Sequence, residues 1–329
     1  MSNLDVTRAI LEKIKEYQRI MLFRHIRMDG DCVGATMGLR GILRLTFPEK
    51  DVRIIDEQTS DFLSFVGPAD EPIPDEAYRD ALGIVLDTSV RSRISNPKYA
   101  LCRELIKIDH HIETDPYGNL NWVEEGRSSA CEMVARFYEA FSDFLRIDSQ
   151  AAACVFLGMV TDSGRFRFSG VGGDTMRLAG LMLDQGVDTE TLFAHLYLQD
   201  FDGLKFKAYV YEHIERTENG VAYIDVDRAA RARFGLSFEA ASNAVSYLEN
   251  LRGCLCLMAF IAPDDPAEGV RVRIRSRFLP VNAVAESHHG GGHANACGAT
   301  VYSPEEKQAL IAQADALVRD YKANHTGWM

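Results

Sequence analysis

Cysteines are few and scattered, so they indicate neither a disulfide framework nor a zinc site. The 329 residues include seven, which is an odd number. The two that lie closest together, Cys254 and Cys256, belong to the apolar run CLCLMAFIA, which is typical of a buried strand. We therefore predict reduced thiols and a cytoplasmic location.

Long hydrophobic runs and a surplus of basic charge are also missing. The longest apolar stretches, such as AAACVFLGMV, have about half the length that a membrane-spanning helix needs. The first residues have helical periodicity and acids from the start, which is not the pattern of a signal peptide. The net charge of −12 excludes a protein coated with basic surface for long nucleic acids. We expect a soluble protein whose partners include neither a membrane nor a long nucleic acid.

The length and the order of elements indicate two domains. Hydrophobic residues make up 47% of the chain and charged residues 26%, which is ordinary for a globular protein. Strands alternate with helical stretches in the first part, as in a parallel sheet with crossover helices. We therefore predict an α/β protein, with a parallel-sheet domain over 1–195, a linker over 196–212, and a smaller α+β domain with a mixed sheet over 213–329.

Acids and histidines stand where several apolar segments end. The first strand runs into HIRMDGD, and later segments end as VLD, IDHH and VTD. A single Asp after a strand is commonly a turn or cap residue. Because the carboxyl ends of parallel strands meet at one edge, however, we expect these side chains to lie together, where cations must balance their charge. The residues concerned are His25, Asp29, Asp31, Asp87, Asp109, His110, His111 and Asp162.

The donor types indicate the kind of metal and the number of ions. Oxygen and imidazole donors without clustered thiolates favour Mn²⁺ or Mg²⁺ over structural zinc. The donors outnumber the ligands of one ion, so we expect two ions. Gly30 lets the loop fold tightly enough to aim Asp29 and Asp31 at different ions. Two neighbouring ions can activate a water and hold phosphate oxygens, which indicates phosphoester hydrolysis.

Taken in order, these motifs resemble a known family. HIRMDGD, VLD, IDHH and VTDSGRFRFS resemble motifs I to IV of the DHH phosphoesterase superfamily, and GGGHANACG, preceded by IRSR, resembles its DHHA1 domain. The layout is similar to the nano-RNase and pAp-phosphatase branch. This resemblance implies hydrolysis of very short oligonucleotides, linear dinucleotides or 3′-phosphoadenosine 5′-phosphate (pAp), in a cleft between the two domains. A homodimer is compatible with the sequence.

The resemblance also implies the ligands of two Mn²⁺ ions, for which Mg²⁺ or Co²⁺ could substitute. Asp87 would bridge the two ions. The other ligands of the first ion would be His25 and Asp29. The other ligands of the second ion would be Asp31, His110 and Asp162.

Three residues are implied to be catalytic. Asp87 would act through the metals, and His111 would contact the scissile phosphate. Asp109 would orient His110 from outside the ligand shell.

In the second domain the resemblance implies a site for the terminal phosphate of the substrate. Three successive glycines would be odd in a strand or helix, so we expect a loop whose N–H groups approach an anion, with His293 adding a charge or hydrogen bond. Arg275 would bind the phosphate in a bidentate manner. His289 stands where the family usually has a further Gly. The implied substrate-binding residues are Arg275, Ser276, Gly290, Gly291, Gly292 and His293.

Two other functions fit part of the pattern. A family II inorganic pyrophosphatase shares the DHH motifs but has a Lys- and Arg-rich C-terminal segment, so GGGHANACG argues against it. A nucleotide- or RNA-binding module without catalysis would lack a ligand, whereas all eight motif positions are filled.

Overall fold

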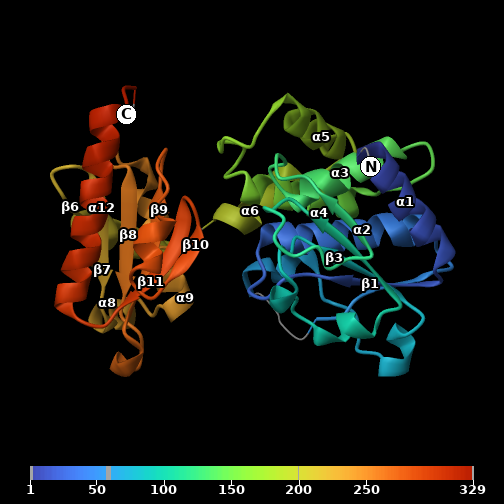
Figure 1. The fold of residues 1–329 in the computed structure, drawn as a ribbon, viewed down its shortest axis with the longest axis horizontal. Helices are drawn as coiled ribbons and strands as arrows, with labels where there is room; N and C mark the ends of the chain where they lie inside the picture. Colours follow the sequence, from blue (N-terminus) through green and yellow to red (C-terminus); the bar gives the residue numbers. More distant parts are fainter. Residues whose placement is uncertain (1–2, 57–60, 199, 328–329) are drawn as a thin grey trace. The chain divides into compact units, whose positions relative to one another are not determined.

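The structure, a computed structural model, describes residues 3–56, 61–198 and 200–327. The chain forms two compact units, Met1–Leu198 and Gln199–Met329 (Figure 1). Each unit has its own sheet and its own hydrophobic core. The predicted fold class, a parallel-sheet α/β domain followed by a smaller domain with a mixed sheet, is confirmed.

Within the described residues, the sheet of the first unit has five parallel strands in the order β2-β1-β3-β4-β5. The central strand β3 is buried along its whole length, as expected when helices or loops cover both faces. Because all strands run the same way, the residues that follow β1, β3 and β4 share one edge. The strands are β1 Arg19–Phe23, β2 Asp51–Ile54, β3 Leu82–Leu86, β4 Glu104–Asp109 and β5 Leu120–Val123.

Helices of the first unit begin at side chains that cap them. Asp29, Ser129 and Asp148 each accept a hydrogen bond from a backbone N–H of the first turn, which has no partner within the helix. Helix α2 packs against both the sheet and α4 (Figure 1). The helices are α1 Asn3–Glu16, α2 Gly30–Thr46, α3 Ala130–Ala140, α4 Ser149–Asp162, α5 Gly173–Leu183 and α6 Thr189–Tyr197, with the 3-10 helices η1 Asp61–Val66, η2 Asp75–Tyr78, η3 Arg91–Arg93 and η4 Pro97–Leu101.

The second unit is built on a mixed sheet in the order β10-β11-β9-β8-β7-β6. The pair β7 and β8 is parallel and the other pairs are antiparallel. Hydrophobic clusters on its two faces form the core. The strands are β6 Glu215–Arg216, β7 Val221–Val226, β8 Cys256–Ile261, β9 Val270–Ser276, β10 Gly291–His293 and β11 Ala296–Val301.

The segment 196–212, predicted to be a linker, contains the end of α6 and the whole of α7. The side chains of Phe206 and Val210 from α7 lie in a core cluster of the second unit. The helices of this unit are α7 Phe201–Glu212, α8 Arg228–Arg233, α9 Phe238–Ser242, α10 Ala244–Tyr247, α11 Asn282–Glu286 and α12 Pro304–Asn324, with the 3-10 helices η5 Leu248–Asn250 and η6 Pro266–Glu268.

The glycine-rich segment differs from its prediction, because Gly291–His293 forms the edge strand β10 instead of an open loop. Glycine is required here by close packing: a Cβ on Gly290 would collide with the carbonyl oxygen of Gly298. Gly292 has φ +136, which other residues rarely adopt. His289 also has a left-handed backbone, with φ +56, at the position where the family usually has Gly.

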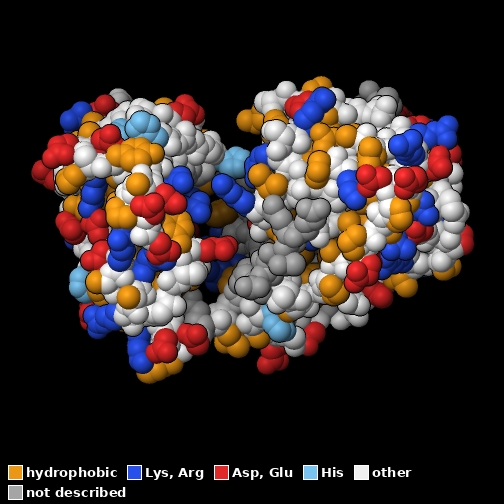
Figure 2. Space-filling view, turned by 90° about the horizontal axis from the view of Figure 1, so that it is seen from below, with side chains coloured by type: hydrophobic (Ala, Val, Ile, Leu, Met, Phe, Trp, Pro, Cys, Tyr) orange, Lys and Arg blue, Asp and Glu red, His pale blue; other side chains and the backbone are white. Residues whose placement is uncertain are grey.

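Two surface properties bear on the predicted partners. No helix among the described residues is long and apolar enough to cross a membrane. Figure 2 shows acidic and basic side chains mixed over one face of both units.

Candidate metal centre

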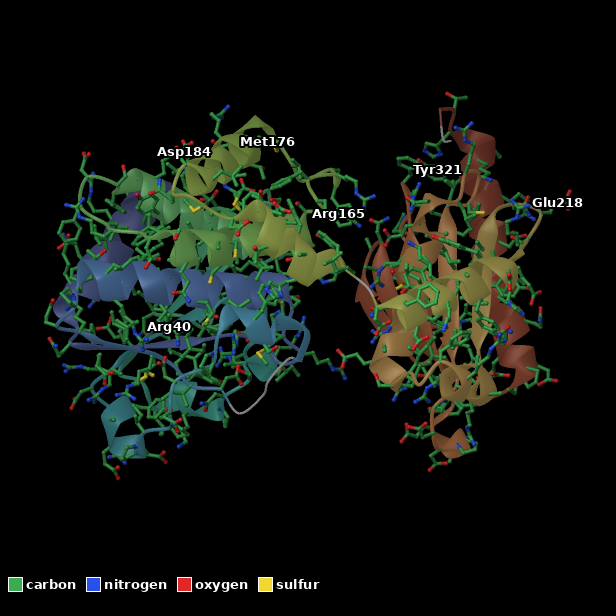
Figure 3. All side chains as sticks on the ribbon, turned by 180° about the vertical axis from the view of Figure 1, so that it is seen from behind. Arg40, Arg165, Met176, Asp184, Glu218 and Tyr321 are labelled. Atoms are coloured by element: carbon green, nitrogen blue, oxygen red, sulfur yellow. The ribbon has the colours of Figure 1, made fainter. Side chains whose placement is uncertain are left out.

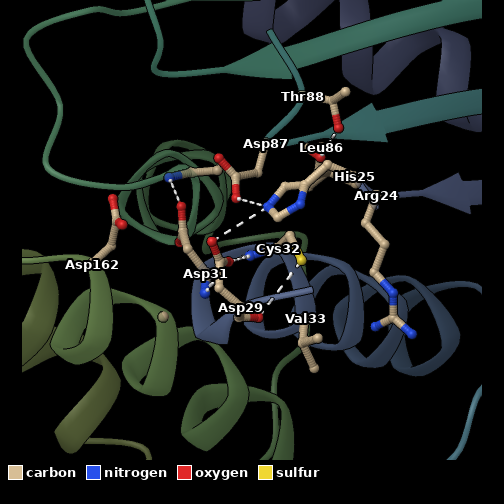
Figure 4. Close-up of polar contacts among 12 residues, drawn as sticks. Arg24, His25, Asp29, Asp31, Cys32, Val33, Leu86, Asp87, Thr88 and Asp162 are labelled. Atoms are coloured by element: carbon tan, nitrogen blue, oxygen red, sulfur yellow. Dashed lines mark hydrogen bonds and ion pairs between the residues drawn. The ribbon is translucent and has the colours of Figure 1, made fainter. Parts of the chain in front are cut away.

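The acids and histidines predicted to bind metal meet at one edge of the first sheet. Figure 4 shows five of them: His25, Asp29, Asp31, Asp87 and Asp162. They arrive on different elements: His25 follows β1, Asp87 follows β3 and His110 follows β4. Asp29 caps α2, and Asp31 lies in its first turn. Asp162 is the last residue of α4, so a helix and not a strand delivers it.

The first group of donors contains His25, Asp29 and Asp87. Nε2 of His25 lies 3.4 Å from Asp29 Oδ2 and 3.3 Å from Asp87 Oδ2. The thiol of Cys32 belongs to the same group, and all four donor atoms lie within 4.8 Å of one another. Cys32 was not among the ligands predicted from the sequence.

The second group contains Asp31, His110 and Asp162, whose donor atoms also lie within 4.8 Å of one another. Nε2 of His110 lies 3.7 Å from Asp31 Oδ2 and 3.4 Å from Asp162 Oδ2. The same nitrogen lies 3.4 Å from Asp87 Oδ1. Asp87 therefore faces both groups, one carboxylate oxygen toward His25 and the other toward His110.

Asp87 has two further properties of a functional residue. It is buried, with φ +54, a left-handed conformation that costs free energy in a residue other than glycine. Its Oδ1 is also buried and makes no hydrogen bond within the described part of the chain. Its charged neighbours are ring nitrogens of His110 and His111, at 3.4 and 3.6 Å. A buried carboxylate oxygen that makes no close hydrogen bond fits a cation ligand.

Backbone carbonyls orient the two ligand histidines in the same way. Nδ1 of His25 lies 2.7 Å from the carbonyl oxygen of Ile26, and Nδ1 of His110 lies 3.2 Å from that of Arg127. When Nδ1 donates to a carbonyl, the neutral ring presents the lone pair of Nε2. In both histidines Nε2 is the atom that faces the carboxylates.

Asp31 is held by a helix that lies a hundred residues further along the chain. Its oxygens accept hydrogen bonds from the backbone N–H groups of Ala130 and Cys131, at 2.6 and 2.9 Å. These N–H groups belong to the first turn of α3, where they have no partner within the helix. Gly30 allows α2 to approach α4, because a Cβ there would collide with Oγ1 of Thr161. Its role is thus close packing.

Several side chains of the cluster have pKa values far from their usual range. Burial raises the pKa of Asp31 well above its usual range, and the nearby Asp87 and Asp162 carboxylates raise it further. Burial and the neighbouring carboxylates also raise the pKa of Asp162 to about 6. Burial opposes protonation of His110, but the carboxylates of Asp87 and Asp31 outweigh it and raise its pKa to about 10. The site therefore holds protons that a cation would displace.

Asp109 differs from its predicted role. It was expected to orient His110, but its Oδ1 accepts from Nδ1 of His111 at 2.8 Å. Nε2 of His110 faces the carboxylates, and its Nδ1 faces the carbonyl oxygen of Arg127. Nδ1 of His111 is the nitrogen that contacts Asp109, and it also lies 3.6 Å from Asp87 Oδ1, so His111 forms a further donor group with Asp87 and His110.

Lys107 is a supporting residue that the motifs did not reveal. It is fully buried two positions before Asp109, on the same side of β4, and its Nζ lies 3.3 Å from Asp109 Oδ2. The same Nζ donates to the carbonyl oxygen of Ser89 at 2.8 Å. The only sequence signal is a lysine within the apolar run LIKID.

The loop after Asp162 has an unusual backbone. Gly164, Arg165 and Phe166 are all left-handed, with φ values of 59°, 63° and 59°. Such a conformation costs roughly 1–2 kcal/mol for each residue other than glycine. The loop places the guanidinium of Arg165 4.4 Å from the ring centroid of Tyr197, and Figure 3 labels this arginine. An exposed cation thus stands three residues from Asp162.

In the second unit, the strand register aligns two of the predicted substrate-binding residues. His293 on β10 is paired with Ala296 on β11, and Ala296 is paired with Arg275 on β9. Residues directly opposite in antiparallel strands point to the same face. His293 and Arg275 therefore share a face, about 10 Å apart across the small Ala296.

Arg275 has the properties of an anion-binding residue. Burial lowers the pKa of its guanidinium, which makes no ion pair within the described part of the chain. Its Nη1 donates to the carbonyl oxygen of Ile274 at 3.0 Å. Ser276, by contrast, is engaged locally, because its hydroxyl donates to the carbonyl oxygen of Leu279 at 2.7 Å.

Comparison with known proteins identifies the family. The model of the DHH family N-terminal domain matches residues 19–159, and the model of the DHHA1 domain matches residues 219–320. The chain is also similar to a solved structure, an exopolyphosphatase-related protein from Bacteroides fragilis. The two share 22% identity with a TM-score of 0.85, over 96% of this chain and 97% of the other. This likeness supports the fold.

Two relatives extend the similarity over nearly the full chain. A bifunctional oligoribonuclease and PAP phosphatase, NrnA, of Bacillus subtilis is 33% identical over 95% of this chain and 99% of its own length. A protein of the same description from Mycoplasma genitalium is 29% identical over 95% of this chain and 97% of its own length. The chain therefore belongs to the DHH family of phosphoester hydrolases and carries both a DHH and a DHHA1 domain.

Proposed function

We propose that this chain hydrolyses very short oligonucleotides or linear dinucleotides to mononucleotides, with pAp as a second substrate. The observation that carries this proposal is Asp87, a buried carboxylate whose two oxygens face two groups of metal donors. The relatives named as oligoribonuclease and PAP phosphatase support the substrate class.

The donor set fits two divalent cations, and we propose Mn²⁺ as the natural metal. The buried Oδ1 of Asp87, which makes no hydrogen bond within the described residues, and the carboxylate-facing Nε2 atoms of His25 and His110 support this fit. When bound, two such cations supply the Lewis-acid charge that makes a water acidic and polarises a phosphate. One cation would be held by His25, Asp29 and Asp87, and the other by Asp31, Asp87, His110 and Asp162.

The proposed role of His111 is to meet the phosphate. Because Nδ1 is engaged by Asp109, we assign the contact with the phosphate to Nε2. In the protonated ring Nε2 can donate to a phosphate oxygen or pass its proton to the leaving oxygen. The negative charge of Asp109, itself beside Lys107, stabilises the ring in the orientation that this role requires.

The proposed role of the second unit is to hold the phosphate at the far end of the substrate. Arg275 would bind it through two N–H groups, and His293 would add a hydrogen bond from the same face of the sheet. The small side chain of Ala296 leaves room between them. We propose that Gly290 and Gly292, where a Cβ would collide with β11, keep β10 close against β11, so that His293 lies at a fixed distance from Arg275.

A substrate panel tests the proposal. Purified protein with Mn²⁺ is incubated with pAp, linear dinucleotides, 5-mers, 24-mers and inorganic pyrophosphate, and the products are separated by chromatography. We expect mononucleotides from the short substrates. Turnover of pyrophosphate alone would favour the pyrophosphatase alternative, and metal-independent binding without turnover would favour a binding module.

Asp109→Asn is expected to lower kcat about 10- to 100-fold on dinucleotides at saturating Mn²⁺, because His111 loses a charged partner. The affinity for Mn²⁺, measured by electron paramagnetic resonance of the free ion, should stay within about twofold, since Asp109 contacts no proposed ligand. The opposite result, weakened Mn²⁺ binding with normal kcat at saturation, would restore the role of Asp109 toward His110.

The stability of the chelated protein is expected to fall as the pH rises from 6 to 9. The pKa of His110 is raised to about 10 in the folded state, above its usual value near 6.5. Its stabilising contribution is therefore complete below about pH 6.5 and is lost as the pH rises through about 10. Mn²⁺ replaces the displaced proton, so saturating Mn²⁺ should raise the Tm more at pH 8.5 than at pH 6. Calorimetric scans with and without EDTA measure this, and a larger gain at pH 6 would contradict it.

A further inference from the structure

One donor of the first group is a thiol. Cys32 lies in the first turn of α2, directly after Asp31, and its side chain is fully buried. Its Sγ is within 4.8 Å of the donor atoms of His25, Asp29 and Asp87 (Figure 4). The group thus combines one nitrogen, one sulfur and two oxygen donors.

This spacing suits four ligands of a single ion. In tetrahedral sites the metal lies about 2.0–2.3 Å from nitrogen, oxygen and sulfur donors, so that the donors are roughly 3.3–3.8 Å apart. Nε2 of His25 already lies 3.4 and 3.3 Å from the two carboxylates. Small side-chain adjustments would bring Sγ to the same range.

Packing alone also buries thiols, and Cys131 provides the comparison. Both Cys32 and Cys131 are buried, and both direct Sγ toward a backbone carbonyl, 3.6 Å from that of Asp29 and 3.4 Å from that of Asp31. Within the described residues, only Cys32 of these two belongs to a group of metal donors. Burial and the weak S–H contact are therefore shared, whereas the surrounding donors distinguish Cys32.

We propose that Cys32 is a thiolate ligand of the first donor group and makes it a site for thiophilic divalent cations such as Zn²⁺, Co²⁺ and Cd²⁺. On binding, the thiol proton passes to solvent as the metal–sulfur bond forms. Mn²⁺ prefers oxygen donors and gains little from the sulfur, whereas softer cations gain more. The inference deepens the proposed function, on which it rests for the identity of the other ligands, and predicts that such cations compete with Mn²⁺.

The test is the absorption spectrum of Co²⁺ in the metal-stripped protein, recorded without substrate. A thiolate ligand produces a sulfur-to-cobalt charge-transfer band in the near ultraviolet, which imidazole and carboxylate ligands do not. We expect the band in the wild type and in Cys131→Ala, and its loss in Cys32→Ala and Cys32→Ser. Bound Co²⁺ without the band in the wild type, or loss of the band in Cys131→Ala alone, would overturn the proposal.

The affinities of the wild type and the Cys32 variant for Cd²⁺ and Mn²⁺ provide a second test. In competition with a chromophoric chelator, Cys32→Ala should bind Cd²⁺ at least about tenfold more weakly, while its Mn²⁺ affinity stays within about twofold. Equal losses for both cations would also overturn the proposal. Circular dichroism checks the fold of each variant, and Cys32→Ser replaces Cys32→Ala if the latter does not fold. Failure of the proposed function would appear instead as absent Mn²⁺-dependent turnover on every nucleotide, with the cobalt band unaffected.

Discussion

Replacing Asp87 by Asn is expected to abolish turnover while leaving the fold intact. Oδ2 of Asp87 lies 3.3 Å from His25 and Oδ1 lies 3.4 Å from His110, so this carboxylate is the residue that both donor groups share. An amide has no charge and offers one oxygen, so at least one cation would lose its ligand. With saturating Mn²⁺ we expect a loss of at least about a hundredfold in kcat on dinucleotides.

The fold should survive, because Asn, like Asp, tolerates the left-handed backbone of position 87, with φ +54, better than most residues other than glycine. Circular dichroism and the Tm check this directly. Asp202→Asn, at an exposed carboxylate that pairs with Lys205, is the matched control and should keep full activity. If Asp87→Asn kept more than about a tenth of the wild-type rate with saturating Mn²⁺, the two-metal assignment would be wrong.

Di- to pentanucleotides are expected to be cleaved at least about a hundredfold faster than 24-mers. The proposed binding of the far phosphate by the second unit would position the reacting phosphate. Arg275 and His293 share one face of the second sheet and would hold a terminal phosphate. A chain with a net charge of −12 offers little basic surface for further nucleotides. Initial rates on 5′-labelled strands of each length measure this preference, and a faster rate on 24-mers would contradict it.

If His293 helps to bind the terminal phosphate, the effect of His293→Ala depends on the substrate. Turnover of dinucleotides should fall at least about tenfold more than turnover of bis-p-nitrophenyl phosphate, a small ester that has no terminal phosphate to hold. Arg271→Ala, on the same strand as Arg275, is the control and should change neither rate, since Arg271 is exposed and contacts Thr300. Equal losses on both substrates would exclude this role for the second unit.

The clustering of acids and histidines was largely predictable from the sequence, for a local reason. His25, Asp87 and His110 follow short apolar runs of the kind that indicate buried strands, and parallel strands end at a common edge. Asp29 directly precedes helix α2, and its side chain caps that helix, which is again a local property. The order of strands and helices likewise indicated the two folds, because periodicity along the chain reflects which faces are buried.

Long-range packing decided which side chains contact one another at the site, which the sequence pattern could not indicate. Asp31 is held by the N–H groups of Ala130 and Cys131, and no local signal specifies a partner a hundred residues away. Asp109 contacts His111 and not its predicted partner His110, because side-chain direction depends on neighbours from other elements. The thiol of Cys32 joined the first donor group for the same reason.

The glycine-rich segment shows most clearly the difference between what the local sequence indicates and what long-range packing decides. By composition alone GGGH suggested an open loop, since successive glycines carry an entropic cost in a strand. In the tertiary structure Gly291–His293 pairs with β11 as an edge strand. Gly290 admits the close approach of Gly298, and Gly292 that of Cys297. The sequence by itself indicated the candidate ligands for metal, apart from Cys32, and the candidate residues for phosphate. Strand register, which depends on contacts between segments distant in the chain, decided that His293 and Arg275 share one face.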